Sequence, residues 1–277
     1  LDDLIFRKLN IKKEDKGLEK WADYVVERVK HPSQEVKISV VGKYITLPDA
    51  YKSIYEALTH GGIANDAGVI INKVDSEELE DAKDLSKVLG DSKGILIPGG
   101  FGNRGIEGKI AAIRFARENK VPFFGICLGM QLATIEFARN VCGMKNANST
   151  EFDPKTEFPV ISLLEEQKAV KDMGATMRLG AYQCRIIKDS NAFQAYKKET
   201  ISERHRHRYE FNPKYRKAME KQGAVIAGEN PQKDLVEIFE IKDHPWFVAC
   251  QFHPEFKSKP DKAHPLFRDF IKAALGS

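Results

Sequence analysis

The segment that decides the fold is Val121-Pro122-Phe123-Phe124-Gly125-Ile126-Cys127-Leu128-Gly129. Its apolar first part has the length of a buried strand, and a helical pattern follows at once and runs to about Arg139. Glycines two residues before and after Cys127 permit a sharp strand-to-helix turn. This is the G-x-nucleophile-x-G form of a nucleophile elbow, with cysteine in place of serine. At a helix N-terminus the thiolate is favoured, and the N–H of Leu128 could bind an oxyanion. The alternative is a buried cysteine in a glycine-bounded turn.

The rest of the chain alternates between strand and helix patterns. Apolar runs at 36–42, 67–74 and 94–98 predict strands, and the spacing predicts helices over 48–60 and 106–118, with Gly61-Gly62 ending the first. Short connections between them predict a parallel, doubly wound sheet. Residues 146–172 look irregular and polar. Further strands are expected at 177–187, 224–228, 235–241 and 247–252, and a last helix at 264–274.

Composition excludes several classes of protein. The 277 residues are 42% hydrophobic and 30% charged, which is ordinary for a globular protein and argues against disorder. A net charge of +4 makes nucleic acid an improbable partner, and no apolar run is long enough for a membrane span. The four cysteines form no CxxC pair and no secretory leader is visible, so we expect a cytoplasmic protein.

A second reactive group lies in Phe252-His253-Pro254-Glu255, directly after an expected strand. Proline favours extended geometry in the residue before it, so His253 and Glu255 could project to one side. Glu255 could then hold the imidazole in the tautomer that accepts a proton from Cys127. The alternative is a surface turn, but an elbow cysteine together with a strand-end His-x-Glu favours a catalytic triad.

Two other motifs leave alternatives open. Residues 100–105 match G-x-G-x-x-G, which would suit a dinucleotide, although the next strand ends in the cysteine elbow and lacks a ribose-binding acid. The loop could equally supply backbone N–H groups to an oxyanion hole. On a strand, residues 203–209 would place three arginines on one face and His205 and His207 on the other. Phosphate contact and a solvated edge strand are both open there, and no metal site is expected.

Together these residues resemble a known family. Residues 125–131, 98–102 and 253–255 look like a class I, triad-type glutamine amidotransferase, and several other stretches resemble the glutaminase domain of the CTP synthase family. Those stretches are 41–51, 148–152, 176–180 and 204–209. The resemblance implies a flavodoxin-like, mostly parallel sheet flanked by helices, with additional antiparallel strands. It places the amidotransferase domain at 36–277, and 1–35 would be the end of a synthetase domain and its linker.

The resemblance also implies a mechanism. Cys127 would attack the side-chain amide of L-glutamine, His253 would act as base and acid, and Glu255 would orient it. Gly100 and Leu128 would form the oxyanion hole. The implied glutamine-binding residues are Gly100, Leu128, Gly129, Met130, Gln131, Glu151 and Arg208. The residues implied near a GTP effector site are Phe101, Arg178 and Leu179.

The family further implies partners for this domain. No G-x-x-x-x-G-K-[ST] loop occurs, so we expect the isolated glutaminase half, without a cofactor of its own. ATP and Mg²⁺ would belong to the amino-terminal synthetase domain, GTP would activate, and the whole enzyme would be a homotetramer that aminates UTP. Three other hypotheses remain open: the glutaminase subunit of another class I amidotransferase, a dinucleotide-binding oxidoreductase and a non-catalytic assembly module.

Overall fold

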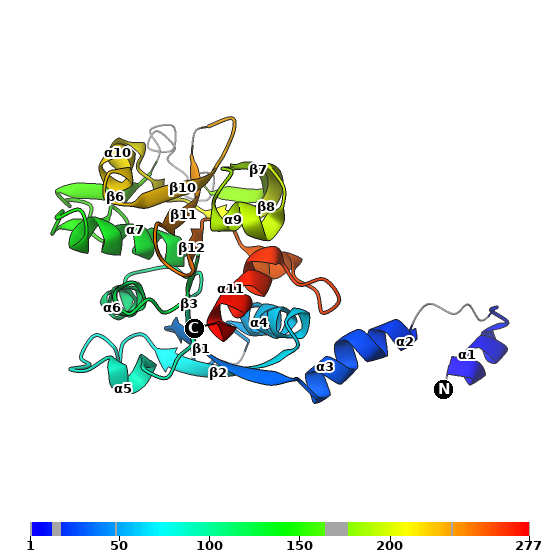
Figure 1. The fold of residues 1–277 in the computed structure, drawn as a ribbon. Helices are drawn as coiled ribbons and strands as arrows, with labels where there is room; N and C mark the ends of the chain where they lie inside the picture. Colours follow the sequence, from blue (N-terminus) through cyan, green and yellow to red (C-terminus); the bar gives the residue numbers. More distant parts are fainter. Residues whose placement is uncertain (1, 13–17, 48, 164–176, 234, 277) are drawn as a thin grey trace.

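A nine-stranded sheet forms the centre of the protein in the computed structural model, which describes residues 2–12, 18–47, 49–163, 177–233 and 235–276 (Figure 1). In spatial order the strands are β2 (Ala67–Asp75), β1 (Gln34–Gly42), β3 (Gly94–Ile97), β4 (Phe123–Ile126), β12 (Phe247–Cys250), β11 (Val236–Ile241), β10 (Ala224–Glu229), β7 (Arg178–Ile186) and β8 (Thr200–His207). The pairings from β2 to β12 are parallel, and those from β12 to β8 are antiparallel. The predicted α/β class, a parallel sheet with added antiparallel strands, is confirmed.

Helices cover both faces of this sheet and complete two apolar cores. One face carries α4 (Lys52–Ala64), α9 (Asn191–Tyr196) and α11 (Pro265–Leu275). The other carries α5 (Ser86–Leu89), α6 (Ile106–Glu118), α7 (Leu128–Asn140) and α10 (Arg216–Glu220). Because β3, β4 and β12 lie in the middle of the sheet, their apolar residues are buried on both sides. The ends of these strands therefore form a rigid platform for the site.

Short elements complete the fold. A second sheet contains β5 (Ala147–Ser149), β6 (Phe158–Ser162) and β9 (Glu210–Phe211), and 3₁₀ turns lie at Pro213–Tyr215 and Pro254–Lys257. The prediction that 146–172 is irregular was therefore wrong for β5 and β6, which are too short to show a period in the sequence. Residues 164–172 of that stretch lie outside the described residues.

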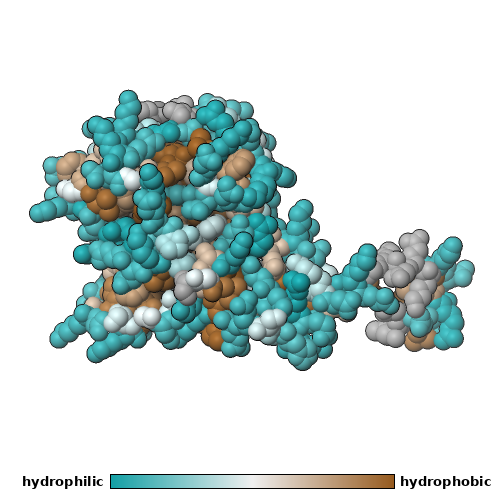
Figure 2. Space-filling view, in the orientation of Figure 1, coloured by the Kyte–Doolittle hydropathy of each residue, from teal (hydrophilic) through white to brown (hydrophobic). Residues whose placement is uncertain are grey.

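The amino-terminal part is helical and extends from the body (Figure 1). It contains α1 (Asp2–Leu9), then α2 (Leu18–Trp21), a π turn (Ala22–Val26) and α3 (Glu27–Lys30), which stops before His31. Figure 2 shows a largely hydrophilic surface on this side of the molecule, broken by small hydrophobic patches. None of the helices within the described ranges has both the length and the apolar character needed to cross a bilayer.

The first long helix, α4, differs from its prediction at both ends. It begins at Lys52, after a turn, and it continues through Gly61 and Gly62 to Ala64. These glycines do not end the helix because tertiary packing requires them. A Cβ at Gly61 would lie 2.8 Å from the backbone oxygen of Phe267, and one at Gly62 would lie 2.4 Å from that of Ala67. The glycines let α4 approach α11 and the start of β2.

This packing reverses the usual effect of a glycine-to-alanine change in a helix. Alanine normally stabilises a helix interior by up to about 1 kcal/mol relative to glycine. We expect Gly62→Ala instead to lower the free energy of unfolding by about 1–3 kcal/mol, because its Cβ would meet backbone. The measurement is chemical denaturation, with Thr59→Ala on the exposed side of the same helix as the control. A Gly62→Ala protein as stable as the wild type would contradict this packing.

Candidate active site

Cys127 occupies the turn between β4 and α7, and its backbone has the geometry of an elbow. Its φ is 52° and its ψ is −100°, a conformation that a non-glycine residue rarely adopts. Its N–H donates to the carbonyl of Cys250 at the end of β12, over 2.8 Å. Gly129 allows α7 to start against β3, since a Cβ there would lie 2.3 Å from the Ile97 oxygen. The predicted elbow is therefore present, with the thiol at the N-terminus of a helix.

His253 and Glu255 follow β12 and form a hydrogen-bonded pair. The Nδ1 of His253 lies 2.8 Å from the Oε1 of Glu255, whose side chain is buried. The backbone N–H of His253 donates to the Arg204 carbonyl on β8, over 2.7 Å. With Nδ1 engaged by the carboxylate, Nε2 remains for another partner.

That partner is Cys127. Burial lowers the pKa of His253, but hydrogen bonds to Cys127 and Glu255 and the charges of both outweigh it and raise the pKa to about 10. His253 and Cys127 also lie close to the same point of the backbone. A Cβ at Gly99 would lie 2.9 Å from His253 Cε1 and 3.6 Å from Cys127 Cβ. The structure thus brings Cys127, His253 and Glu255 together, in the order that nucleophilic catalysis needs.

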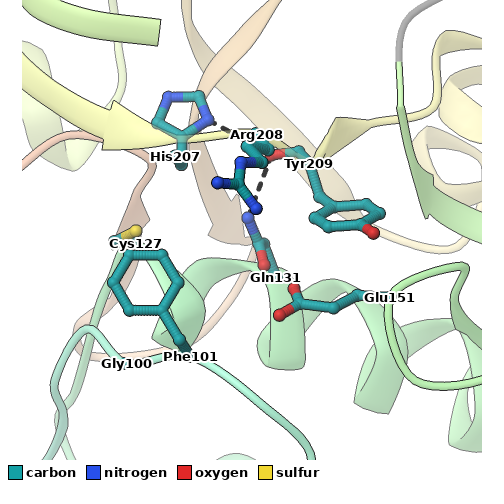
Figure 3. Close-up of a pocket in the computed structure, with 8 residues that line it drawn as sticks. All are labelled: Gly100, Phe101, Cys127, Gln131, Glu151, His207, Arg208 and Tyr209. Carbon is teal, nitrogen blue, oxygen red and sulfur yellow. Dashed lines mark hydrogen bonds between the residues drawn. The ribbon is translucent and has the colours of Figure 1, made fainter. Parts of the chain in front are cut away.

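A small cleft opens beside the sulfur (Figure 3). The residues that line it are Gly100, Phe101, Cys127, Gln131, Glu151, His207, Arg208 and Tyr209. Figure 3 shows Cys127 at one side of the cleft and Glu151 at the other, with Arg208 pointing in between them. The site therefore offers a nucleophile at one end and opposite charges at the other.

At the charged end of the cleft, Arg208 has hydrogen-bonding capacity that the described residues leave unused. The Nε of Arg208 is buried and has no hydrogen-bond partner among the described residues. Burial raises the pKa of Glu151, while the N–H of Gly102, 3.3 Å from its Oε1, and the charges of Lys43 and Arg208 lower it. A zwitterion with an ammonium and a carboxylate would complement both side chains.

The predicted oxyanion donors also lie together. Leu128 is the first residue of α7, where N–H groups have no partner within the helix. A Cβ at Gly100 would lie 3.3 Å from Leu128 Cδ2, so the loop after β3 lies against the start of α7. Gly100 also lines the same cleft as Cys127, and Leu128 follows Cys127 directly in the chain.

Comparisons with known proteins agree with this site. The family model for "Glutamine amidotransferase class-I" matches residues 46–273. The CTP synthases of Syntrophus aciditrophicus and Clostridium acetobutylicum are 59% and 56% identical over 99% of this chain. The glutaminase domain of Trypanosoma brucei CTPS, solved with bound acivicin, is 41% identical, with a TM-score of 0.82 over 87% of this chain and 94% of that one. The chain belongs to the class I glutamine amidotransferase family, as a glutaminase domain of the CTP synthase type. It spans about half the length, 51%, of the curated relatives it matches.

Family membership favours the amidotransferase interpretation of residues 100–105 over a dinucleotide site, because Gly100 lines the cleft of Cys127. Other residues for which the sequence predicted glutamine binding have side chains with different surroundings. Gly129 and Met130 are buried and pack into the core, so only their backbones could face a substrate. Gln131 lines the cleft, but its Nε2 donates to the Tyr209 carbonyl, over 3.0 Å.

The three residues that were expected near an effector differ in exposure. Phe101 and Leu179 are 49% and 61% exposed. Arg178 is buried, and its guanidinium donates to Glu237, over 2.8 Å, and to Glu210, over 3.2 Å. Its charge is therefore already neutralised within the amidotransferase domain, and an external nucleotide would not reach it in this conformation.

The arginine and histidine run lies on β8 only as far as His207, so Arg208, which was predicted on one face with Arg204 and Arg206, follows the strand and lines the cleft. Arg204 and Arg206 point outward, whereas His205 and His207 are buried. Within the described ranges, no cluster of three histidine, cysteine or acidic side chains could hold a metal. Sequence reasoning missed Gly99, His207 and Tyr209, although all three lie in segments that it singled out. It also missed Gln251, whose Nε2 lies 3.8 Å from Cys127 Sγ.

The pairing of Cys127 with His253 can be tested by titration. We expect Cys127→Ala to lower the pKa of His253 well below about 10, because burial then acts without the sulfur's hydrogen bond and charge. NMR of the imidazole protons between pH 5 and pH 11 measures it. Cys142→Ala, a half-buried cysteine outside the cleft, is the control. An unchanged His253 pKa in Cys127→Ala would show that the two residues do not interact.

Proposed function

We propose that this chain hydrolyses L-glutamine to glutamate and ammonia through the Cys127–His253–Glu255 triad. The observation that carries the proposal is the hydrogen-bonded His253–Glu255 pair beside a cysteine in an elbow turn. In the proposed reaction, the Cys127 sulfur attacks the side-chain amide carbon of glutamine. The imidazolium of His253 gives its proton to the departing ammonia, and a glutamyl thioester remains. His253 then takes a proton from water, which hydrolyses the thioester and releases the thiolate.

The other cleft residues receive roles from their chemistry. The backbone N–H groups of Leu128 and Gly100 stabilise the oxyanion of each tetrahedral intermediate, a contribution of roughly 10²–10³-fold in rate per donor. Arg208 binds the α-carboxylate of glutamine and Glu151 its α-ammonium group. The lack of a partner for Arg208 Nε among the described residues supports the first role, and the partial burial of Glu151 favours a cationic ligand for the second.

The ammonia is proposed to serve a second domain. The curated relatives named CTP synthase are about twice as long as this chain, so half of each lies outside the match. We infer that a synthetase domain, for which 1–35 would be the end and the linker, aminates UTP with ATP and Mg²⁺. GTP activation and a homotetramer of the whole enzyme belong to the same proposal.

Triad variants test the reaction. We expect Cys127→Ser to abolish release of glutamate, because a hydroxyl is far less ionised than a thiol at neutral pH. His253→Ala should cost roughly 10²–10⁴-fold in kcat, and more than Glu255→Gln, which only loses orientation and charge. Cys142→Ser is the control and should retain activity. Glutamate is measured with and without GTP, and CTP is measured in the presence of UTP, ATP and magnesium. Glutamate without CTP is expected. Full turnover by His253→Ala would require another base.

Substrate recognition makes a separate prediction. Glu151→Gln should raise KM for glutamine about tenfold or more with a smaller effect on kcat, because it removes charge from a binding contact remote from the reacting carbon. Glu157→Gln, an exposed residue of the same region, is the matched control. Equal KM values for the two variants would remove Glu151 from the glutamine site.

A further inference from the structure

The side-chain amides of two buried glutamines form a series of hydrogen bonds that ends at the Cys127 sulfur. Gln251 follows β12 and is fully buried, and Gln131 lies on α7 and is 4% exposed. The Nε2 of Gln251 lies 3.8 Å from Cys127 Sγ, and its Oε1 lies 3.4 Å from Gln131 Nε2. The same Gln131 Nε2 lies 3.0 Å from the carbonyl oxygen of Tyr209. The backbone N–H of Gln251 donates to the Glu237 carbonyl, over 2.9 Å, which fixes its main chain.

The Tyr209 carbonyl, at the end of this series of hydrogen bonds, determines how each side-chain amide is oriented. A backbone carbonyl only accepts hydrogen bonds, so Gln131 must present its NH₂ group to Tyr209. That NH₂ group also faces Gln251, which must therefore turn its oxygen toward Gln131. Its own NH₂ group is then left for Cys127. The opposite amide orientation would place two donors against each other at one end and oxygen against sulfur at the other.

We propose that Gln251 is a dedicated hydrogen-bond donor to the Cys127 thiolate, held in that polarity by Gln131 and the Tyr209 carbonyl. The proposal rests on the proposed function, since it assigns Gln251 a part in the same reaction. Gln251 has no exposed surface, so it contacts the sulfur from the protein side and leaves the cleft free for substrate. Gln131, for which the family resemblance implies glutamine binding, gains the role of orienting this donor.

A hydrogen-bond donor on the buried side of the sulfur suits its chemistry. A buried thiolate needs hydrogen bonds or charge to replace water, and His253 supplies one hydrogen bond and one charge. When His253 gives its proton to ammonia, the amide remains as a neutral donor that does not titrate. Gln251 therefore favours the thiolate both at rest and as the leaving group when the thioester breaks down.

The test measures the sulfur directly and does not use glutamine. Iodoacetamide alkylates thiolates, so the rate of Cys127 alkylation against pH, followed by peptide mass spectrometry, reports how readily the thiol ionises. The variants are Gln251→Met, which keeps the approximate shape without the donor, and Gln251→Glu, which places an acceptor there. Gln183→Glu makes the same change at an exposed position of the same sheet and is the control. The titratable or charged groups around the sulfur, unchanged in all variants, are His253, Glu255, His207, Arg208, Glu151 and Cys250.

We expect the midpoint of alkylation to rise by about half to one pH unit in Gln251→Met and by more in Gln251→Glu, with no change in Gln183→Glu. Alkylation of buried Cys184 would reveal a variant that fails to fold. In that case Gln131→Met, which frees the amide from its anchor, should give a smaller rise. A folded Gln251→Met or Gln131→Met protein with the wild-type midpoint would overturn the proposal. This experiment uses no glutamine, so its outcome is separate from that of the glutaminase assay. If the alkylation midpoint shifts as expected but the protein releases no glutamate, the proposed function is refuted and this inference stands.

Discussion

The site depends on one backbone hydrogen bond, from the N–H of Cys127 to the carbonyl of Cys250. It joins the end of β4 to the end of β12 and holds Cys127 at a positive φ, a conformation that costs roughly 1–3 kcal/mol and persists only where its surroundings enforce it. Because His253 follows Cys250 by three residues, the same bond helps to set the distance between Cys127 and His253. Neighbouring parallel strands in a fully buried part of the sheet make that distance rigid.

The antiparallel half of the sheet supports the same centre from the other side. The carbonyl of Arg204 on β8 accepts the N–H of His253, and β8 leads directly to Arg208 and Tyr209 in the cleft. The buried ion pairs of Arg178 with Glu210 and Glu237 join β7 to β11 and to the segment after Tyr209. The strands that are added to the doubly wound sheet therefore shape the substrate end of the cleft, whereas the parallel strands shape the chemical end.

The sequence predicts the parallel strands, the elbow and the His-x-Glu pair because each has a local signature. The sequence does not predict features that depend on contacts between residues far apart in the chain. Gly61 and Gly62 look like a helix end, yet they allow close packing of α4. β5 and β6 are too short to show a period. The burial of Arg178 depends on carboxylates 32 and 59 residues away. The orientation of the Gln251 amide depends on a carbonyl on another strand connection, which no local pattern reveals.

We propose that the elbow makes Cys127 the one nucleophile for glutamine. The most direct measurement treats the chain with the glutamine-like electrophile 6-diazo-5-oxo-L-norleucine and maps the adduct by peptide mass spectrometry. We expect one adduct per chain, on Cys127, and slower formation in the presence of glutamine. An adduct on Cys142, Cys184 or Cys250, or labelling of Cys127 that glutamine does not slow, would contradict it.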